Sequence, residues 1–564
     1  MSDRVMQDPE RVETVTCAIN GVEVTAPKGT NIIEAAELAG IGVPHYCYHP
    51  GLSAPAMCRM CLVEVEGAPK LMPGCVTPIG DGQVIRTESE KAREARTGVL
   101  EFYLLNHPLD CPVCDKSGEC KLQDYVHDEG RKHGRLVQLK RVLGRDDFGG
   151  DVIYDGDRCI MCTRCVRFMR EIAGEDRLCV VQRGDRSVID TFFEEGVAGN
   201  LWADNIIDIC PVGALLSKDF HHKARVWDLD RTPSICPNCS QGCNIALDTR
   251  DDLVMRLRPR HNPEVNSHWM CDYGRLSYEW LNRGARVGEP LRGAGPGARA
   301  GAAGADAAGS PESQPQPISW QDAIVTLVAR LRELKSRGVR NVTVVGSPMH
   351  ANEDNALLAR LADVLGGGRK IFRSARAADE AECPGFPTLA RRRDLVANTR
   401  GLELLGFERI GDDQGNGGID DEDGVVIVLA DELRDAGERF ATGAELFVYL
   451  GVIGAPVARN ADFVLPVTTF AEQEGTFTNH EGRVQRFWPA LQAPTLARPA
   501  WQVLGVLLAG LDDGPAPATA SDAFLRAAQL HEAFDGLDYV TIGASGAPAR
   551  TPAGAGASDA RGSE

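Results

Sequence analysis

The sequence lacks the features by which several broad protein classes are recognised. In its 564 residues, no run approaches the roughly 18 consecutive apolar residues of a membrane-spanning helix. The first residues, MSDRVMQDPERVE, contain no apolar stretch of the kind that a secretory signal has. We therefore expect neither an integral membrane protein nor a secreted one.

Positive charge is also scarce. The chain has 61 Lys and Arg residues against 80 Asp and Glu residues, so its formal net charge is −19. Surfaces that bind nucleic acid need positive charge, so we expect no nucleic-acid partner. The hydrophobic fraction of 43% excludes a wholly disordered chain. At this length we expect about three to five domains.

Two stretches lack the side chains that build a core. Between residues 293 and 317 the only apolar residues are alanine and proline, and we predict a flexible linker over 286–317. The last residues are again of low complexity and predict a disordered tail over 541–564. No G-x-G-x-x-G motif follows a predicted strand, so the sequence indicates no nicotinamide site.

Cysteine, in contrast, is abundant. Of the 18 cysteines, 17 lie before residue 272, and Cys383 is the only one beyond it. In a long chain without a secretory signal, cysteines indicate metal ligands or redox groups rather than disulfides. The sequence therefore predicts a metal-binding half followed by an ordinary half.

The pattern of apolar residues predicts a multidomain chain of α+β and α/β type. Apolar alternation around Asn20-Gly21 predicts a hairpin, and Ile32, Ala35, Ala36 and Ala39 share one face of a following helix. After the linker, short apolar strands alternate with helices, which indicates a largely parallel sheet. We expect helices at 320–334 and 353–365, and strands at 341–345, 425–429 and 446–450. The predicted segments are 12–90, 91–135, 140–225, 230–285, the linker, 318–540 and the tail.

The first set of predicted ligands is Cys47, Cys58, Cys61 and Cys75. The Cys-x2-Cys pair brings two thiolates to one centre, and the two distant cysteines complete four sulfur ligands. This number suits a [2Fe–2S] cluster, although the first gap is longer than in plant-type ferredoxins. A structural zinc site takes the same four ligands and remains the alternative for this set.

The second set combines one histidine with three cysteines: His107, Cys111, Cys114 and Cys120. Three cysteines hold three irons of a cubane, and His107, four residues upstream, is the candidate for the fourth. A neutral imidazole in place of a thiolate is expected to raise the potential of such a cluster.

The third set is Cys159, Cys162, Cys165 and Cys210, followed by a proline. In two-cluster ferredoxins, each C-x2-C-x2-C-x3-C-P run gives its fourth cysteine to the other cluster. On that pattern, the ligands of a second cluster would fall at Met169, Asn200, Ala203 and Ile206, and none of these is cysteine. We therefore predict a ferredoxin-like segment with one [4Fe–4S] site.

The fourth set is Cys236, Cys239, Cys243 and Cys271, which suits either a cubane or zinc. Cys17, Cys179 and Cys383 remain over and receive no role, because a buried thiol is often only a small hydrophobic side chain.

At this point the motifs resemble a known family. HPLDCPVCDKSGECKLQD, CIMCTRCVRF and DICPVGAL together resemble the bacterial counterpart of the mitochondrial 75 kDa subunit, the large iron–sulfur subunit of respiratory complex I. The flanks of the fourth set, among them CDYGRLSYEW, resemble the iron–sulfur module of molybdopterin oxidoreductases. In the C-terminal half, residues 461–487 resemble the same oxidoreductase superfamily. The resemblance implies an N-terminal β-grasp [2Fe–2S] domain, a helical His/Cys domain, a [4Fe–4S] ferredoxin-like domain, and a molybdopterin-oxidoreductase-like module and α/β domain.

The resemblance further implies one [2Fe–2S] and three [4Fe–4S] clusters, with no molybdenum, since the C-terminal half is short and Cys383 has unfamiliar surroundings. It implies an electron relay in a proton-translocating NADH:quinone oxidoreductase. Its partners would be the FMN- and NADH-binding flavoprotein with its [2Fe–2S] companion, and the subunits with the terminal clusters. These would hold it, as a peripheral subunit, at the cytoplasmic face of the bacterial inner membrane, with the membrane arm contacted only indirectly.

Two alternatives stay open from the sequence. NAD-linked formate dehydrogenases and hydrogenases share this N-terminal layout, but they generally keep two cubanes in the ferredoxin-like domain and carry a complete catalytic domain. A zinc-bearing scaffold protein is the other alternative, because four-cysteine sets also bind zinc.

Overall fold

The computed structural model describes residues 13–282, 284, 286–293, 315–410, 424–429, 440–454 and 456–550. The chain divides into two compact units. Unit 1 comprises Met1–Leu229 and Cys383–Pro387, and unit 2 comprises Asp230–Glu382 and Thr388–Glu564. None of the helices in the described ranges is long and apolar enough to cross a membrane.

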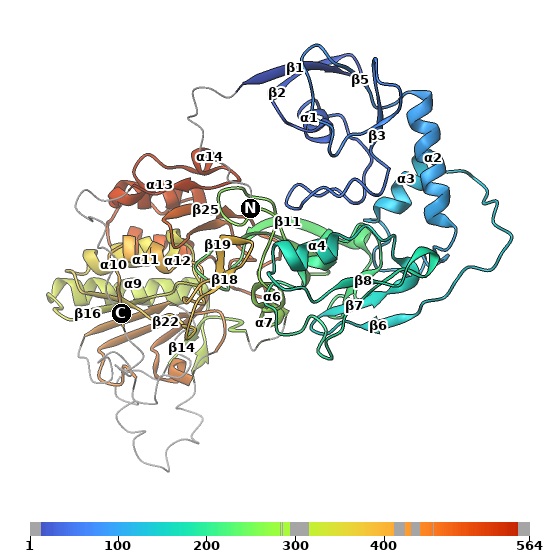
Figure 1. Ribbon diagram of the computed structural model, residues 1–564. Coiled ribbons are helices and arrows are strands. Elements are labelled where there is room, and N and C mark those ends of the chain that lie inside the picture. Colours follow the sequence, from blue (N-terminus) through green and yellow to red (C-terminus); the bar gives the residue numbers. More distant parts are fainter. Residues whose placement is uncertain are drawn as a thin grey trace, which may run out of the picture. The chain divides into compact units, whose positions relative to one another are not determined.

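Unit 1 begins with a mixed five-stranded sheet in the order β2-β1-β5-β3-β4 (Figure 1). Its elements are β1 (Thr14–Ile19), β2 (Val22–Pro27), α1 (Ile32–Leu38), β3 (Leu62–Val65), β4 (Met72–Pro73) and β5 (Val84–Arg86). The predicted hairpin is confirmed, because Asn20 and Gly21 join β1 to β2 with φ of 49° and 85°, as a type I′ turn requires. The predicted face of α1 is buried at Ile32, Ala35 and Ala36.

The rest of unit 1 is built from short elements separated by long loops. Two helices come first, α2 (Glu90–Leu104) and α3 (Lys121–Glu129). There follow β6 (Arg145–Asp147), β7 (Val152–Asp155), α4 (Arg164–Glu171), β8 (Cys179–Val181), β9 (Val188–Asp190), α5 (Asn205–Ile209) and β10 (Leu215–Ser217). Strands β10, β7 and β6 form one antiparallel sheet, and β8 pairs with β9. The buried guanidinium of Arg96 on α2 bonds to Glu129 at the end of α3, which ties the two helices together.

Unit 2 opens with an antiparallel three-stranded sheet and two short helices. These are β11 (Asp230–Ile235), β12 (Asn244–Arg250), β13 (Leu253–Pro259), α6 (Asp272–Leu276) and α7 (Glu279–Asn282). Further along the chain comes the hairpin of β18 (Ala381–Cys383) and β19 (Phe386–Arg391), of which Cys383–Pro387 are counted with unit 1. A second antiparallel sheet of unit 2 follows it in the chain. That sheet contains β24 (Gly475–Thr478), β25 (Arg483–Phe487) and β26 (Ala547–Pro548).

The centre of unit 2 is an eight-stranded sheet in the order β15-β14-β23-β22-β21-β16-β17-β20. Its strands are β14 (Leu291–Arg292), β15 (Gln316–Pro317), β16 (Val342–Gly346), β17 (Arg369–Phe372), β20 (Glu408–Arg409), β21 (Val425–Leu429), β22 (Leu446–Gly451) and β23 (Phe463–Pro466). All neighbouring pairs from β23 to β20 are parallel, whereas β14 and β15 are antiparallel. The prediction of a largely parallel sheet is therefore confirmed.

Helices cover this sheet and complete the main core (Figure 1). They are α9 (Trp320–Ser336), α10 (Asn352–Val364), α11 (Thr399–Leu404), α12 (Ala500–Gly510), α13 (Ala520–Leu530) and α14 (Tyr539–Ile542). Residues of α9, α10, α12 and α13 form one buried cluster with strand residues such as Val344, Ile427 and Val448. A separate cluster that includes Val345, Val426 and Phe447 lies on the opposite sheet face, as the alternation of side chains along a strand requires.

Two sequence predictions differ from the structure at their edges. The predicted linker over 286–317 is part of the sheet at both ends, where Leu291 pairs with Pro317 and Arg292 with Gln316. The predicted disordered tail over 541–564 is ordered as far as Arg550, because Ala547–Pro548 pairs with β25. Residues 294–314 and 551–564 lie outside the described residues. Backbone pairing of distant segments, which composition does not reveal, accounts for both differences.

Candidate metal centres

The four thiols of the first predicted set converge in the loops around β3 and β4. Hydrogen bonds from the Cys58 and Cys75 thiols lower the pKa of Cys47, whereas the bond to Cys47, together with burial, raises the pKa of Cys58. Cys75 also bonds to Cys61 and lowers its pKa. All four residues are buried. Such sharing of protons among four thiols within hydrogen-bond reach suits a centre that takes four sulfur ligands.

Gly74 lies at a close contact between two parts of the first set. The Gly74 N–H donates to the carbonyl of Cys61 at 2.8 Å, and a Cβ at position 74 would lie 3.2 Å from that oxygen. The turn after β4 that carries Cys75 therefore approaches the Cys-x2-Cys loop closely, and a side chain at position 74 would crowd this contact.

The second predicted set lies between the end of α2 and the start of α3. Cys120 is the residue directly before α3, Cys114 is buried, and Cys111 is exposed. Electrostatic interactions couple the Cys114 thiol to those of both Cys111 and Cys120.

His107 has the properties of a ligand. Its Nδ1 is buried and has no hydrogen-bond partner among the described residues. Burial lowers the pKa of its ring to about 4, so the imidazole is neutral near pH 7. Metal ions bind the neutral form of histidine, so both observations fit a fourth ligand beside the three thiols.

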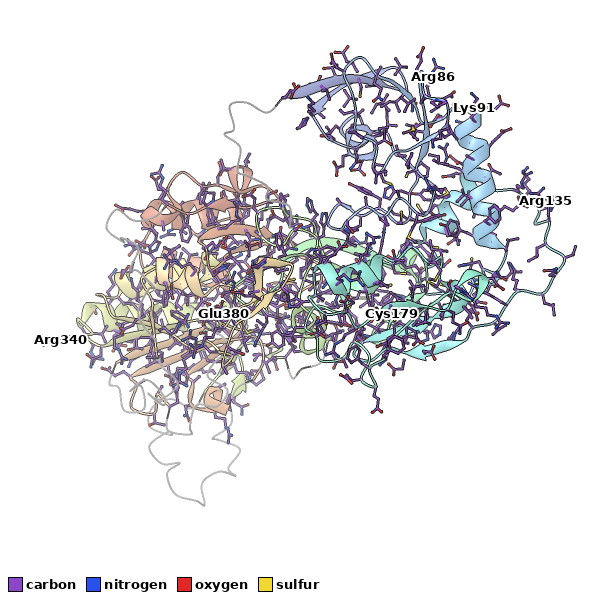
Figure 2. The ribbon with its side chains drawn as sticks, in the orientation of Figure 1. Arg86, Lys91, Arg135, Cys179, Arg340 and Glu380 are labelled. Atoms are coloured by element: carbon purple, nitrogen blue, oxygen red, sulfur yellow. The ribbon has the colours of Figure 1, made fainter. Side chains whose placement is uncertain are left out.

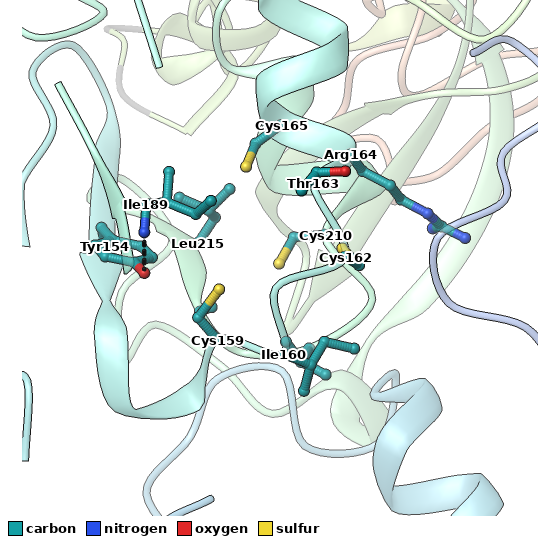
Figure 3. Close-up of a pocket in the computed structure, with 12 residues that line it drawn as sticks. Tyr154, Cys159, Ile160, Cys162, Thr163, Arg164, Cys165, Ile189, Cys210 and Leu215 are labelled. Atoms are coloured by element: carbon teal, nitrogen blue, oxygen red, sulfur yellow. Dashed lines mark hydrogen bonds between the residues drawn. The ribbon is translucent and has the colours of Figure 1, made fainter. Parts of the chain in front are cut away.

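The third predicted set surrounds a hollow in unit 1 (Figure 3). Cys159, Cys162 and Cys165 come from the loop before α4 and its first turn, and Cys210 directly follows α5. The other walls are mostly apolar: Tyr154, Ile160, Ile189, Val212, Ala214 and Leu215. Burial raises the pKa of Cys159 to about 11 and that of Cys162 to about 12. The thiols are therefore neutral unless a bound cation holds them as thiolates.

The positions at which a second ferredoxin-type cluster would be held carry buried side chains instead. Met169 and Ile206 are fully buried, and Ala203 and Asn200 are at most 9% exposed. The Asn200 amide donates to the carbonyl of Ala173. Packed protein therefore occupies these four positions.

The fourth predicted set lies in unit 2. Cys236 follows β11, Cys243 precedes β12, and the Cys236 N–H donates to the Cys243 carbonyl at 2.8 Å. Cys271 caps α6 and accepts the Gly274 N–H at 3.3 Å. A Cβ at position 274 would lie 3.0 Å from the Cys236 Sγ and 3.4 Å from the Cys271 Sγ. Cys239 is also buried, and burial raises the pKa of all four thiols.

Within unit 1, two arginine side chains connect backbone carbonyls of the first and third sets. The Arg167 guanidinium donates to the carbonyl of Cys47 at 2.5 Å and to that of Cys162 at 3.4 Å. Arg164 donates to the carbonyls of Tyr48 and Ile209, each of which adjoins a predicted ligand. Loops that hold two ligand sets are thus fastened to one helix, α4.

The second set adjoins the third in the same way. Arg158, directly before Cys159, pairs with Asp110, directly before Cys111, at 2.8 Å. A Cβ at Gly213 would lie 2.2 Å from the Cys114 Sγ. The loop that follows Cys210 therefore packs directly on a thiol of the second set.

Tyrosines pack between the first and second sets. The ring of Tyr46 lies 5.2 Å from that of Tyr103 and 5.3 Å from that of Tyr125. Tyr103 donates to the Cys58 carbonyl at 3.2 Å. Burial raises the pKa of Tyr46, and the thiols of Cys120 and Cys58, which belong to different sets, raise it further.

The buried arginines of α4 indicate whether anionic groups fit the first and third ligand sets. Arg164 and Arg167 are 4% and 8% exposed, and their hydrogen bonds within the described residues go to carbonyls and to the Thr163 hydroxyl rather than to carboxylates. A buried positive charge needs a negative counterpart. Thiolate-ligated clusters are anionic, so the residues present fit such groups.

The connecting residues were not predicted from the sequence. Arg164 and Arg167 lie within the motif CIMCTRCVRF, but the carbonyls of Tyr48 and Cys47 that they reach in the first segment are more than 100 residues away. Alternation of cysteine with arginine is a usable signal of charge near the third set, whereas the tyrosine cluster leaves no comparable pattern. The three unassigned cysteines are all in described parts: Cys17 is buried in β1, Cys179 lies on β8, and the buried Cys383 thiol donates to the Ile172 carbonyl at 3.5 Å.

Comparison with protein families matches five modules along the chain. A 2Fe–2S iron–sulfur cluster binding domain matches residues 12–90, and the NADH-ubiquinone oxidoreductase-G iron–sulfur binding region matches 96–135. The ferredoxin-like domain of NADH-quinone oxidoreductase subunit 3 matches 149–216. The molybdopterin oxidoreductase Fe4S4 domain matches 229–283, and the molybdopterin oxidoreductase family matches 424–509. The chain thus carries domains of the 2Fe–2S and 4Fe–4S binding classes, which places it among the iron–sulfur proteins.

Two individual relatives indicate which iron–sulfur proteins this chain is similar to. The NADH dehydrogenase [ubiquinone] iron-sulfur protein 1 of Solanum tuberosum mitochondria is 38% identical over 367 residues, which are 64% of this chain and 46% of the relative. An NADH-quinone oxidoreductase subunit of Rickettsia bellii is 43% identical over 268 residues, 47% of this chain and 39% of the relative. The chain is therefore a relative of these bacterial and mitochondrial iron–sulfur subunits of NADH dehydrogenase, as its motifs predicted.

The chain spans less than half the length of these two relatives. Among solved structures, a chain of an NAD+-reducing [NiFe]-hydrogenase is 28% identical and covers 38% of this chain and 91% of its own length. Its TM-score of 0.34 is too low for any inference about the overall fold.

Proposed function

We propose that this chain is an electron-relay iron–sulfur subunit of a proton-translocating NADH:quinone oxidoreductase. In this proposal it receives electrons from the subunits that oxidise NADH and delivers them toward the subunits near the quinone site. Its relatives are named as subunits of that enzyme, and its modules match the corresponding iron–sulfur domains.

One observation carries the proposal: three ligand sets in unit 1 share their supporting residues. Arg167 contacts the first and third sets, Arg158 with Asp110 joins the second and third, and Tyr46 lies near thiols of the first and second. Electron transfer requires closely spaced carriers, so this arrangement is what a relay needs. An isolated structural zinc site has no need of two neighbours.

We propose one [2Fe–2S] and three [4Fe–4S] clusters, each held by one set. The ligands are Cys47, Cys58, Cys61 and Cys75; His107, Cys111, Cys114 and Cys120; Cys159, Cys162, Cys165 and Cys210; and Cys236, Cys239, Cys243 and Cys271. When bound, such clusters supply one-electron carriers. The chain's own residues hold the ligands, exclude water with apolar walls such as Ile160 and Leu215, and offset anionic charge with Arg164 and Arg167.

We propose domains, partners and a cellular location for the chain on the same basis. The segments 12–90, 91–135, 140–225 and 230–285 would be the β-grasp, His/Cys, ferredoxin-like and molybdopterin-oxidoreductase-type cluster domains. The α/β domain after them would be a scaffold without molybdenum. The flavoprotein with its [2Fe–2S] companion and the subunits with the terminal clusters would be the direct partners, at the cytoplasmic face of the bacterial inner membrane.

Iron analysis combined with low-temperature EPR of the anaerobically prepared chain tests this function. The proposal predicts about 14 irons per chain and separate signals from one [2Fe–2S] and three [4Fe–4S] centres. A second cubane in the ferredoxin-like segment, as in formate dehydrogenases and hydrogenases, would give about 18 irons. Colourless protein with zinc in the thiol sets would overturn the proposal.

A further inference from the structure

A second kind of ligand cluster lies in unit 1, outside the four thiol sets. The Nδ1 atom of His221 lies 2.6 Å from the Asp115 Oδ2, and the Nδ1 atom of His222 lies 3.2 Å from the Asp115 Oδ1. One atom from each of the three side chains lies within 4.8 Å of the others. Neither the motifs nor the matched domains assign a role to these histidines.

The carboxylate of Asp115 is the buried member of this cluster. Its side chain is 4% exposed, whereas those of His221 and His222 are 30% and 58% exposed. It also accepts the backbone N–H of His222 at 3.3 Å. The carboxylate is therefore shielded from water, whereas the two imidazoles are accessible to a small ion in solution.

The cationic residues near Asp115 or near His222 in the sequence have other partners. Arg225 donates to the carbonyls of Pro112 and Cys114, Lys223 pairs with Asp219, and Lys116 pairs with Glu119. The structure thus places two imidazoles against the buried carboxylate. A buried charge is retained when it is paired or coordinates a metal.

The backbone holds the second imidazole in place. His222 has φ of 59°, in the left-handed region that few residues other than glycine adopt. With this conformation, the rings of the two consecutive histidines lie 3.8 Å apart, centroid to centroid, and both present Nδ1 to one carboxylate. In an extended segment, consecutive side chains would point to opposite sides.

We propose that Asp115, His221 and His222 form a binding site for one divalent transition-metal ion of the zinc class. Imidazole nitrogen and carboxylate oxygen are ligands that Zn²⁺ takes readily, and three protein ligands leave a position for water. The site contains no thiol, so it differs in chemistry from the four cluster sets. A metal-bound Nδ1 carries no proton, so a proton that a ring donates to Asp115 from Nδ1 passes to Nε2 of the same ring when the ion binds.

Asp115 directly follows Cys114 in the chain, and this has a consequence that rests on the proposed function. An ion at Asp115 adds positive charge close to the second ligand set, so it raises the reduction potential of a cluster bound there. Loss of the ion lowers that potential. The metal site itself does not depend on the presence of a cluster.

The experiment is Zn²⁺ binding to the full chain after cluster loading under anaerobic conditions. Equilibrium dialysis with metal analysis should give one retained zinc per chain, in addition to the full complement of iron. Zinc K-edge EXAFS should give a first shell of nitrogen and oxygen at about 2.0 Å with imidazole scattering, and no sulfur at about 2.3 Å.

Variants separate this site from adventitious binding. His221→Ala, and His222→Asn, which keeps a residue that tolerates the left-handed conformation, should each weaken zinc binding more than about tenfold. The control is His127→Ala with His133→Ala, since these two histidines are exposed elsewhere in unit 1. Unchanged iron content and thermal midpoint establish that each variant is folded.

The possible outcomes distinguish the two proposals. Zinc retained equally by the His221 and His222 variants, or no zinc retained by iron-replete protein, overturns the metal site and leaves the relay function intact. A sulfur shell together with low iron overturns the relay function, because zinc then occupies the thiol sets.

Discussion

His107 is the single predicted cluster ligand that is not a cysteine, and its role can be tested at the level of one atom. Its buried Nδ1 lacks a partner among the described residues, and burial keeps its ring neutral by lowering its pKa. We expect His107→Ala to remove or alter the EPR signal of one cubane and to leave the other signals unchanged. His107→Cys should retain a cubane with a lower potential, because a thiolate adds negative charge.

The matched control for this prediction is His45→Ala. Burial also lowers the pKa of His45 to about 4, but its Nδ1 is bonded to the carbonyl of Val43 at 2.8 Å. EPR spectra and iron content should be unchanged in this variant. Unchanged spectra in His107→Ala as well would show that His107 is not a ligand.

Glu353 is a buried acid on α10 that belongs to no predicted ligand set, and it makes the stability of unit 2 depend on pH. Tyr539 donates to its Oε1 at 2.7 Å and the Thr476 N–H to its Oε2 at 3.0 Å, but burial dominates and raises its pKa to about 8. The folded state therefore prefers the protonated carboxyl. This stabilisation is fully present below the unfolded pKa near 4.5 and is lost as the pH rises toward 8.

We expect the free energy of unfolding to fall by about 1.4 kcal/mol per pH unit across that window from this group alone. Glu353→Gln should abolish this part of the slope, whereas Glu408→Gln, at an exposed carboxylate, should not. Urea unfolding followed by the fluorescence of the buried Trp320 and Trp501 measures both at pH 5 and pH 8. Parallel pH profiles for the parent and Glu353→Gln would contradict the prediction.

At the scale of elements, a substitution in the loop after α5 tests the contact between the second and third ligand sets. Gly213 lies beside the third set in sequence, but a Cβ there would fall 2.2 Å from the Cys114 Sγ of the second. We expect Gly213→Ala to displace that sulfur, and so to lose iron and the EPR signal of the His107 cubane while the fold persists. Gly98→Ala, at an open position within α2, should keep all signals and stabilise the chain by about 0.5–1 kcal/mol. Loss of the third-set signal alone would contradict the predicted contact.

Elements that depend on local pattern could be predicted from the sequence. The Asn-Gly hairpin is encoded in two adjacent residues, and the apolar run of β21 (Val425–Leu429) is buried at every position. The Cys-x2-Cys pairs are equally local. The largely parallel sheet could be expected because short apolar strands such as β16 alternate with helices such as α9 and α10.

Elements that depend on distant partners could not be predicted. Strands β14, β15 and β26 have two residues each, include proline or border glycine, and exist only because another strand pairs with them. The contact of Asp115 with His221 joins residues 106 positions apart. No periodicity or spacing rule connects such residues, so linker and tail boundaries and the histidine cluster emerge only from the tertiary structure.

At the scale of the whole molecule, the division into two compact units separates the fourth ligand set from the other three. The first three sets belong to unit 1 and share arginines and tyrosines, whereas Cys236, Cys239, Cys243 and Cys271 belong to unit 2 and are held by β11, β12 and α6. Loss of a set that elements of unit 2 hold should leave the three sets of unit 1 unchanged.

We therefore expect Cys271→Ser to lower the iron content from about 14 to about 10 per chain and to remove one cubane signal. The three signals of unit 1 should keep their line shapes and potentials, because their connecting residues are untouched. The control is Cys179→Ser on β8 (Figure 2), whose thiol donates to the carbonyl of Asp190 and belongs to no predicted set, so no iron should be lost. Iron analysis, EPR and redox titration of both variants decide the matter. A shift in all cubane potentials in Cys271→Ser would show that the units act as one electronic system, and loss of iron in Cys179→Ser would show that a ligand had been misassigned.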